Sequence, residues 1–349
     1  MTAYAFWNNK GGVGKSFLCF VAASEYAHRH PKTDVYVIDL CPQANLSEIL
    51  LGGYSNHSSD DLDFPMTRLI KKTPRATVAG YLEARLNSPF SMIADIEPFL
   101  CQPSRFNSKI PKNLWLVCGD SLLEILSEAI RQTSQLSIPI DAWKQVVNWI
   151  KDLMGSCIKK SGERDTLFFL DCNPSFAVYT QLALVAANDI IVPFTADDSS
   201  RRGIENVIAL LYGVGDAYTA SYAKINFAKR AKEENVDVAK LHTFVSNRQT
   251  LFKKKPSKAF QAMDTAIKKT MNNIYRDHRI LFANPKEEPS EKFVIIPDYH
   301  SACVVVGTTG TPLHKLKAGP HNLFGERIQI NLAPLKRYSE ALTEFISHL

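Results

Sequence analysis

The chain has 349 residues, 45% of them apolar and 22% charged, which is a globular composition and excludes an intrinsically disordered chain. The net charge is +6, and the basic excess lies in residues 224–293, with 16 basic and 8 acidic side chains, whereas residues 1–223 carry 20 basic and 23 acidic ones. This distribution fits a module that meets a polyanion, and equally a lysine-rich face exposed to solvent.

Short apolar runs alternate along the chain with longer helical patterns. The strand-like runs are 3–7, 35–40, 114–118, 167–170, 190–194, 242–245 and 293–296. Apolar side chains spaced by three and four predict helices over 16–28, 122–131, 143–158, 200–211 and 257–275. This alternation predicts an α/β fold with a mainly parallel, twisted sheet flanked by helices on both faces. Because no segment is long enough for an interdomain linker, we expect one domain over residues 1–349.

Residues 9–16, which follow the first strand, read NKGGVGKS and lead directly into a helical pattern. Glycines let backbone N–H groups turn inward around phosphate oxygens, and the helix that follows adds its positive N-terminus. Lys15 would place a charge near the β- and γ-phosphates, and Ser16 would bind Mg²⁺. The order of strand, glycine loop, Gly-Lys-Ser and helix therefore predicts a nucleotide site.

The same residues resemble a known family. KGGVGKS resembles the deviant Walker A motif of the ParA/MinD ATPases, in which the extra lysine, here Lys10, reaches across a dimer interface to the partner's nucleotide. Residues 37–47, VIDLCPQANLS, are similar to a segment that usually reads D-x-D-P-Q-G-N, and residues 167–176, LFFLDCNPSF, to the Walker B stretch that commonly reads D-x-P-P-S. The similarity covers most of the chain and leaves about 213–240 and 249–292 as basic helical insertions.

This resemblance implies a P-loop NTPase fold, an ATP-dependent homodimer with ATP sandwiched between the protomers, and an ATP hydrolase. Asn247, in FVSNR, resembles the family asparagine whose amide reads the adenine edge, and the segment from Ile296 to Asp298 resembles the one beside the base. The implied nucleotide-binding residues are Lys10, Gly11, Gly12, Val13, Gly14, Lys15, Ser16, Phe17, Asn247, Pro297 and Asp298.

Two aspartates follow apolar strands and are candidates for the metal site. Asp39 ends VYVID and Asp171 ends LFFLD, and with Ser16 they would hold Mg²⁺, which keeps most of its water ligands and takes few protein oxygens. A single aspartate at a strand end is more often a helix cap or turn former. Two of them in a chain with a phosphate loop favour the metal site.

Cys41 stands where the family has the carboxylate that orients or activates the attacking water. A thiol is a poor hydrogen-bond acceptor and is largely protonated near neutral pH, so it does not replace a fixed negative charge. With Lys10, Lys15 and Asp39, it completes the expected catalytic set. We expect ATP binding with slow hydrolysis. The alternative is that Asp197 or Asp198, after the following strand, positions the water.

A basic segment, FKKKPSK at 252–258, precedes an amphipathic helical pattern. Cations without a base-reading motif imply sequence-independent, salt-dependent binding to duplex DNA, and the alternative is a solvated surface. The candidate DNA-binding residues are Lys253, Lys254, Lys255, Lys258, Lys268 and Lys269. The last helical pattern, 332–349, is charge-balanced on its polar side, so we expect it to pack on the body of the protein and not to bind a membrane.

Other sequence features narrow the functional class. The seven cysteines form no C-x-x-C pair, which argues against a zinc ribbon or an iron–sulfur cluster carrier. The N-terminal sequence does not resemble a signal peptide and no run of 18 apolar residues occurs, so we expect a cytoplasmic protein. The leading hypothesis is a switch ATPase of plasmid or chromosome partition, with a centromere-binding adaptor or another effector as partner. The alternative is a regulatory ATP-binding subunit that controls a protein effector, which Cys41 favours.

Overall fold

The computed structural model describes residues 2–54, 64–215, 227–249, 251–252, 255–256 and 258–349. Seven strands form one parallel sheet in the order β3-β2-β4-β1-β5-β6-β9. Their bounds are β1 Thr2–Phe6, β2 Thr33–Leu40, β3 Leu114–Val117, β4 Asp165–Cys172, β5 Asp189–Phe194, β6 Lys240–Gln249 and β9 Phe293–Pro297. The seven predicted strands are all present, and the predicted P-loop NTPase-like α/β fold with a parallel sheet is confirmed.

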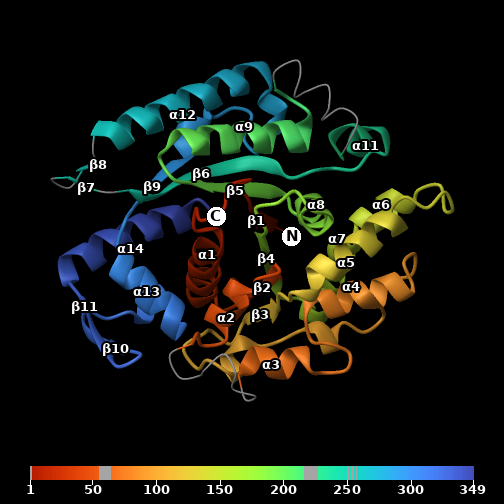
Figure 1. Ribbon diagram of the computed structural model, residues 1–349, viewed down its shortest axis with the longest axis horizontal. Coiled ribbons are helices and arrows are strands. Elements are labelled where there is room, and N and C mark those ends of the chain that lie inside the picture. Colours follow the sequence, from red (N-terminus) through yellow and green to blue (C-terminus); the bar gives the residue numbers. More distant parts are fainter. Residues whose placement is uncertain (1, 55–63, 216–226, 250, 253–254, 257) are drawn as a thin grey trace.

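Helices cover both faces of this sheet (Figure 1). One face is packed by α1 (Lys15–Arg29), α13 (His300–Thr309) and α14 (Leu332–Ser347). The other is packed by α4 (Val78–Asn87), α5 (Leu122–Thr133), α6 (Ala142–Val147), α7 (Trp149–Ser161), α8 (Val178–Ala186), α9 (Asp198–Tyr212), α11 (Phe227–Glu233) and α12 (Lys258–Asp277). In β1, Tyr4 and Phe6 pack into the core on the α1 face, whereas Ala3, Ala5 and, just after the strand, Trp7 pack into the core on the other face. Strands buried on both faces explain the continuous apolar runs of the sequence.

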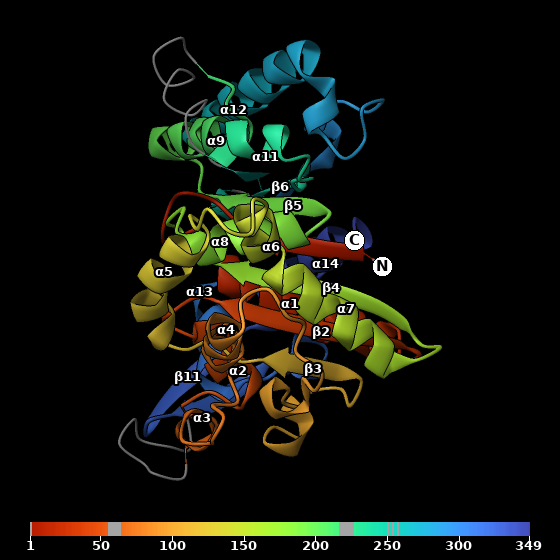
Figure 2. The same cartoon turned by 90° about the vertical axis from the view of Figure 1, so that its right-hand side faces the viewer.

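Shorter elements complete the described part of the chain. They are α2 (Asn45–Leu50), α3 (Pro65–Ile70), the hairpins β7 (Leu251–Phe252) with β8 (Lys255–Pro256) and β10 (Gly319–Leu323) with β11 (Glu326–Ile330), and the 3₁₀ turns Glu97–Phe99, Pro103–Arg105, Arg279–Leu281, Pro289–Lys292 and Leu313–Lys315. At one end of the molecule α9, α11 and α12 lie together beyond β5 and β6, and α2 and α3 lie toward the opposite end (Figure 2).

The predicted helices are present, with one correction. The pattern over 143–158 is not one helix but two, α6 and α7, separated at Asn148. The Asn148 side chain donates to the Lys144 carbonyl at 2.7 Å, so it competes with the backbone for the acceptor that a continuous helix would use. The predicted last helix is α14, which packs on the sheet through Leu335, Leu342 and Phe345. None of the helices described is both long and apolar enough to cross a membrane.

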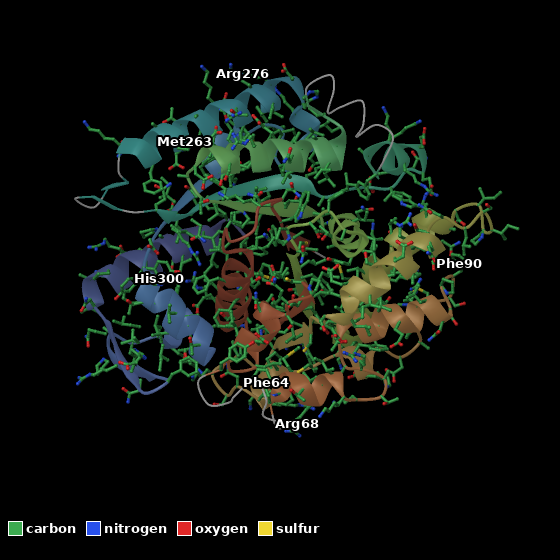
Figure 3. All side chains as sticks on the ribbon, viewed as in Figure 1. Phe64, Arg68, Phe90, Met263, Arg276 and His300 are labelled. Carbon is green, nitrogen blue, oxygen red and sulfur yellow. The ribbon has the colours of Figure 1, made fainter. Side chains whose placement is uncertain are left out.

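The long helix of the basic segment, α12, buries one side against the sheet. Ile267 and Met271 are buried, and Lys258, Lys269 and Arg276 are exposed. Met263 and Arg276 mark its two halves in Figure 3. A buried polar cluster ties α12 to β6, because the Asp264 carboxylate accepts hydrogen bonds from Ser246 Oγ at 2.9 Å and Gln249 Nε2 at 2.7 Å.

Candidate functional site

The carboxyl ends of the parallel strands meet at one edge of the sheet, where the predicted site residues gather. Asp39 of β2 and Asp171 of β4 are in register as neighbours, and Asp171 is also paired with Phe6 of β1, which leads into the phosphate loop. The parallel sheet thus places the loop and both aspartates side by side.

The phosphate loop turns through two glycines with left-handed backbone angles. Gly12 has φ +74° and Gly14 φ +88°. A Cβ at Gly14 would lie 2.3 Å from Asn247 Nδ2, so only glycine fits there. Helix α1 starts at Lys15 without a side-chain cap and without an acidic residue in its first turn. Its first N–H groups therefore remain available for an anion such as a phosphate.

Lys15 is buried at the centre of this edge, with 7% of its surface exposed. Its ammonium group donates to the Lys10 carbonyl at 3.0 Å and the Asn8 carbonyl at 3.4 Å, so the side chain folds back along its own loop. Burial lowers the pKa of Lys15, and the charge of Asp171 opposes that shift. Val13 is buried, Gly11 and Gly12 are exposed, and Ser16 and Phe17 are half-buried.

The two aspartates are both fully buried but differ in their hydrogen bonds. Asp39 accepts from the Cys41 amide at 3.0 Å, the Ser47 amide at 3.0 Å and the Ser47 hydroxyl at 2.7 Å. Burial raises its pKa to about 6, although these hydrogen bonds oppose the shift. Neither oxygen of Asp171 has a hydrogen-bond partner among the described residues. Burial and the neighbouring Asp39 raise the pKa of Asp171, which the nearby Ser16 hydroxyl and Lys15 only partly offset.

This donor set suits a small divalent cation. Two adjacent carboxylates stand beside the Ser16 hydroxyl, and the oxygens of Asp171 accept no hydrogen bond of normal geometry from the part of the chain that the structure describes. Mg²⁺ prefers oxygen ligands of this kind while retaining water. With the uncapped N-terminus of α1 and the buried Lys15, the residues present fit a phosphate-bound Mg²⁺. The cation would neutralise charge on the phosphate oxygens.

Lys10 contacts its own chain in this structure. Its ammonium group lies 2.6 Å from Asp197 Oδ2 and donates to Thr195 Oγ1 at 3.0 Å and Ser200 Oγ at 3.2 Å. Although burial raises the pKa of Asp197, the hydrogen bonds from Lys10, Ser199, Thr195 and the Ser200 amide together hold it well below its usual range. This ion pair was not predicted from the sequence, because it depends on how the loop after β5 folds back over the phosphate loop.

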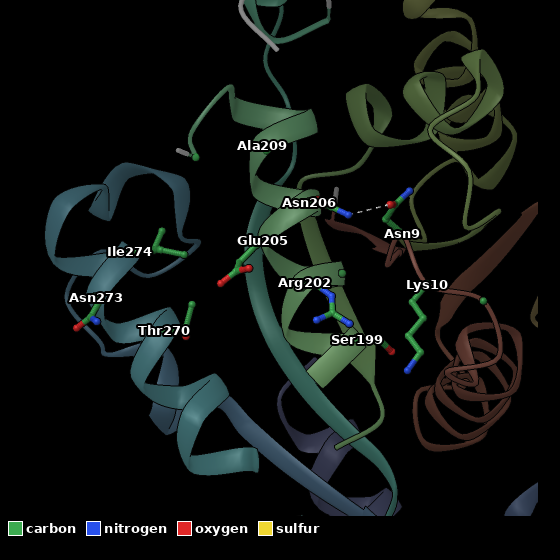
Figure 4. A pocket seen from close by; sticks show the side chains of 13 residues that line it. Asn9, Lys10, Ser199, Arg202, Glu205, Asn206, Ala209, Thr270, Asn273 and Ile274 are labelled. Atoms are coloured by element: carbon green, nitrogen blue, oxygen red, sulfur yellow. Dashed lines mark hydrogen bonds between the residues drawn. The ribbon is translucent and has the colours of Figure 1, made fainter. Parts of the chain in front are cut away.

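Beside Lys10 a pocket of about 880 Å³ opens between the phosphate loop, α9 and α12 (Figure 4). Arg202 and Asn206 of α9 line one wall, and Thr270 and Asn273 of α12 line the other. Asn206 donates weakly to Asn9 Oδ1 at 3.5 Å. Asp197 and Asp198, the alternative candidates for positioning the water, both form ion pairs. Asp197 pairs with Lys10, and Asp198 pairs with Arg201 and Arg202.

Cys41 is buried at the turn after β2, next to the two aspartates. Burial, with the charges of Asp39 and Asp171, raises the pKa of its thiol to about 12, so the thiol is protonated at neutral pH. Asn173 Nδ2 lies 3.9 Å from its sulfur. The backbone is crowded here, because a Cβ on Gly119 would come within 2.9 Å of the Asp39 carboxyl carbon.

Asn247 lies against the phosphate loop, with Nδ2 donating to the Val13 carbonyl at 3.0 Å and Oδ1 accepting from the Arg248 amide at 3.0 Å. One N–H of its amide remains available for a base. The Asp298 amide donates to the Gln249 carbonyl at 2.9 Å, which holds Pro297 and Asp298 at the end of β9 beside the end of β6. The structure thus places Asn247 against the phosphate loop, and Pro297 and Asp298 at the end of the outermost strand β9, next to β6.

The candidate DNA-binding lysines are only partly described. Lys253 and Lys254 lie outside the described residues, and Lys255 belongs to β8. Lys258 and Lys269 are exposed on α12. Lys268 is half-buried, with its ammonium group 5.1 Å from the centre of the Phe293 ring, so part of its surface packs against the body of the protein.

Comparison with known proteins identifies relatives by structure alone. No protein-family model matches the chain, and no curated protein sequence does. Apo McdA of Cyanothece superposes with a TM-score of 0.55 at 14% identity, over 98% of this chain and 99% of that one. A putative plasmid partition protein of Borrelia burgdorferi bound to AMPPNP gives 0.55 at 15% identity, over 100% and 99%. The chain therefore shares its fold with McdA and with the Borrelia protein, over nearly the full length of each.

Proposed function

From the fold that it shares with ParA/MinD-type ATPases, we propose that this chain is a Mg²⁺- and ATP-dependent switch ATPase built as one domain. The supporting observation is that the phosphate loop with the uncapped N-terminus of α1, the buried Lys15, and the neighbouring Asp39 and Asp171 all lie at the carboxyl ends of the strands. The structure of a single-substitution variant of McdA is a complex with ATP and that of the Borrelia protein is bound to AMPPNP, which supports ATP as the ligand here.

The nucleotide would be held by the loop from Lys10 to Phe17 and by the adenine-side residues Asn247, Pro297 and Asp298. Mg²⁺ would be held by Ser16, Asp39 and Asp171. Hydrolysis is slow in this proposal, because the neutral thiol of Cys41 supplies no base or fixed charge for the attacking water.

The active form would be a homodimer around ATP, with Lys10 reaching to the partner's nucleotide. Exposed cations on α12, including Lys258 and Lys269, support nonspecific binding of duplex DNA in plasmid or chromosome partition, with an adaptor protein as partner. The neutral thiol of Cys41 favours a second candidate, a regulatory ATP-binding subunit that controls a protein effector.

Calorimetry on wild type, Lys15→Ala and Lys112→Ala tests the site. Lys15→Ala should weaken Mg·ATP binding at least about a hundredfold, because it removes the buried charge that faces the phosphates. Lys112 is exposed and precedes β3, so it lies at the amino-terminal ends of the strands, away from the proposed site. Lys112→Ala should therefore bind Mg·ATP like wild type. Wild-type affinity in Lys15→Ala would refute the assignment.

Salt-dependent binding of unrelated DNA duplexes distinguishes the two functions. Partition predicts ATP-dependent DNA binding that falls steeply with salt and weakens on neutralising Lys253, Lys254 and Lys255 together. Absence of DNA binding at low salt with ATP would favour the regulatory subunit.

A further inference from the structure

The turn that follows β4 brings a carboxamide to the phosphate loop. Asn173 lies two residues after Asp171 and is half-buried. Its Oδ1 accepts hydrogen bonds from the Ser175 amide and the Ser175 hydroxyl, both at 2.9 Å. These two donors fix which end of the amide carries oxygen, so the NH₂ group points the other way. It points toward Cys41, with Nδ2 3.9 Å from Sγ.

The same turn is fastened to the phosphate loop. Asn9 Nδ2 donates to the Pro174 carbonyl at 3.1 Å, and a Cβ on Gly11 would lie 3.9 Å from Pro174 Cγ. The NH₂ group of Asn173 thus lies between the phosphate loop and Cys41, the residue that replaces the carboxylate of the resembled motif. Because sulfur is a weak acceptor, the hydrogen bond to Cys41 is easily exchanged for one to oxygen.

We propose that Asn173 is the residue that positions the attacking water against the γ-phosphate, through the N–H groups that now face Cys41. This inference rests on the proposed ATP hydrolysis. The sequence supports it independently, because two of the departures from the resembled motifs, cysteine at 41 and asparagine at 173 in place of the usual proline, occur in side chains that touch each other.

The amide acts as a donor and not as a base. The water oxygen bonds to the γ-phosphorus, the bond from that phosphorus to the β–γ bridging oxygen breaks, and the electron pair leaves on ADP. Both protons of the water end on the released phosphate, since a carboxamide is not a base and takes neither. Positioning by a neutral amide is also how a glutamine orients water in small GTPases. Ser175 is the positioning residue that orients the Asn173 amide.

The test compares wild type, Asn173→Ala, Asn173→Asp and the control Asn322→Ala, an exposed position on the β10–β11 hairpin. Asn173→Asp keeps the acceptor for Ser175 while removing both donors. Calorimetry measures affinity for Mg·ADP and for Mg·ADP with tetrafluoroaluminate, a mimic of the transferring phosphoryl group. Both Asn173 variants should bind the mimic about tenfold or more weakly and bind Mg·ADP within about twofold of wild type. Single-turnover hydrolysis should fall in parallel, and Asn322→Ala should match wild type.

A second readout does not depend on turnover. In ¹⁵N-labelled wild type, the side-chain NH₂ resonance of Asn173, identified by its absence from Asn173→Asp, should shift with the mimic and stay in place with Mg·ADP. A resonance that the mimic leaves unmoved, or variants that bind the mimic like wild type, would overturn the role of Asn173 while leaving the ATPase intact. A wild type that binds no nucleotide would instead refute the proposed function itself, and this inference with it.

Discussion

At the scale of single residues, Cys41 decides how fast the proposed reaction runs. Cys41→Asp restores the carboxylate that the resembled family carries there and should raise the single-turnover rate of hydrolysis at least about tenfold, as expected for a positioned general base. The new charge would lie beside Asp39 and Asp171, so affinity for Mg·ATP must be measured with the rate.

Cys41→Ser is the matched control for this experiment, because it changes the side chain without adding charge and should remain slow. Rapid wild-type hydrolysis that Cys41→Asp does not change would show that the thiol position is irrelevant to the rate.

The paired carboxylates predict a pH dependence that can be isolated by mutation. Since burial raises the pKa values of Asp39 and Asp171, and the charge of Asp39 adds to the shift of Asp171, the folded protein binds more protons than the unfolded chain above about pH 4. The free energy of unfolding of the nucleotide-free protein is therefore reduced by this pair as the pH rises from about 4 through 6.

Asp171→Asn should remove most of this penalty. At pH 7 without Mg²⁺, the variant should be more stable than wild type, because it removes the buried carboxylate whose pKa is raised. The advantage should vanish near pH 4, and Mg²⁺-dependent nucleotide binding should be lost. Urea unfolding between pH 4 and 7 measures the free energy of unfolding of both proteins. Asp198→Asn, which replaces an exposed aspartate, is the control. An advantage independent of pH would contradict the repulsion.

The sequence predicted which chemical groups meet at the site but not every contact between them. Asp39 and Asp171 both end apolar strands, and parallel strands bring such ends together, so their proximity followed from the pattern. The contacts of Cys41 with Asn173 and of Lys10 with Asp197 depend on the paths of loops, which hydrophobic periodicity does not encode.

At the scale of elements, long-range apolar periodicity predicted the sheet and its major helices, whereas local side-chain chemistry decided the exceptions. Asn148 divides one expected helix in two through its own hydrogen bond.

The β10–β11 hairpin was not expected, because its two-residue turn is Phe324-Gly325 in place of the usual Asn-Gly, and Phe324 adopts φ +51°. Ala44 likewise adopts φ +53° where the resembled motif has glycine, a strain of about 1 kcal/mol.

The link between α12 and β6 gives an element-scale prediction. Asp264 is buried and holds Ser246 and Gln249, which flank Asn247 at the phosphate loop. Asp264→Ala removes the acceptor of both side chains, leaves the Ser246 hydroxyl without it and leaves Gln249 Nε2 only its hydrogen bond to Ser246 Oγ, so it should destabilise the attachment of α12 by about 2 kcal/mol. Hydrogen exchange should then speed up in residues 258–277 and at the end of β6.

Asp277→Ala, at an exposed position in the last turn of the same helix, should leave exchange in that region unchanged. Unaltered exchange in Asp264→Ala would show that contacts other than this polar cluster, such as those of the buried Ile267 and Met271, suffice to hold α12.

At the scale of the whole molecule, the ion pair of Lys10 with Asp197 competes with the proposed dimer. Lys10 has to leave Asp197 before it can reach a partner's nucleotide, so the pair lowers the apparent affinity of dimerisation. The two side chains are 26% and 46% exposed, which limits the pair to about 0.5–1 kcal/mol. Asp197→Asn should therefore strengthen ATP-dependent dimerisation about two- to fivefold. Asparagine also preserves the N-cap of α9, where Asp197 now accepts the Ser200 amide.

Sedimentation velocity with Mg·ATP measures this effect against three further variants. Lys10→Ala should weaken the dimer, and Lys10→Ala with Asp197→Asn should be no tighter than Lys10→Ala alone, because the released lysine is then absent. Asp198→Asn, which disturbs Arg201 and Arg202 but not Lys10, should dimerise like wild type. If Asp197→Asn tightened the dimer equally with and without Lys10, the gain would come from lost surface charge and not from freeing the lysine, and the role of Lys10 in the partner's site would have to be abandoned.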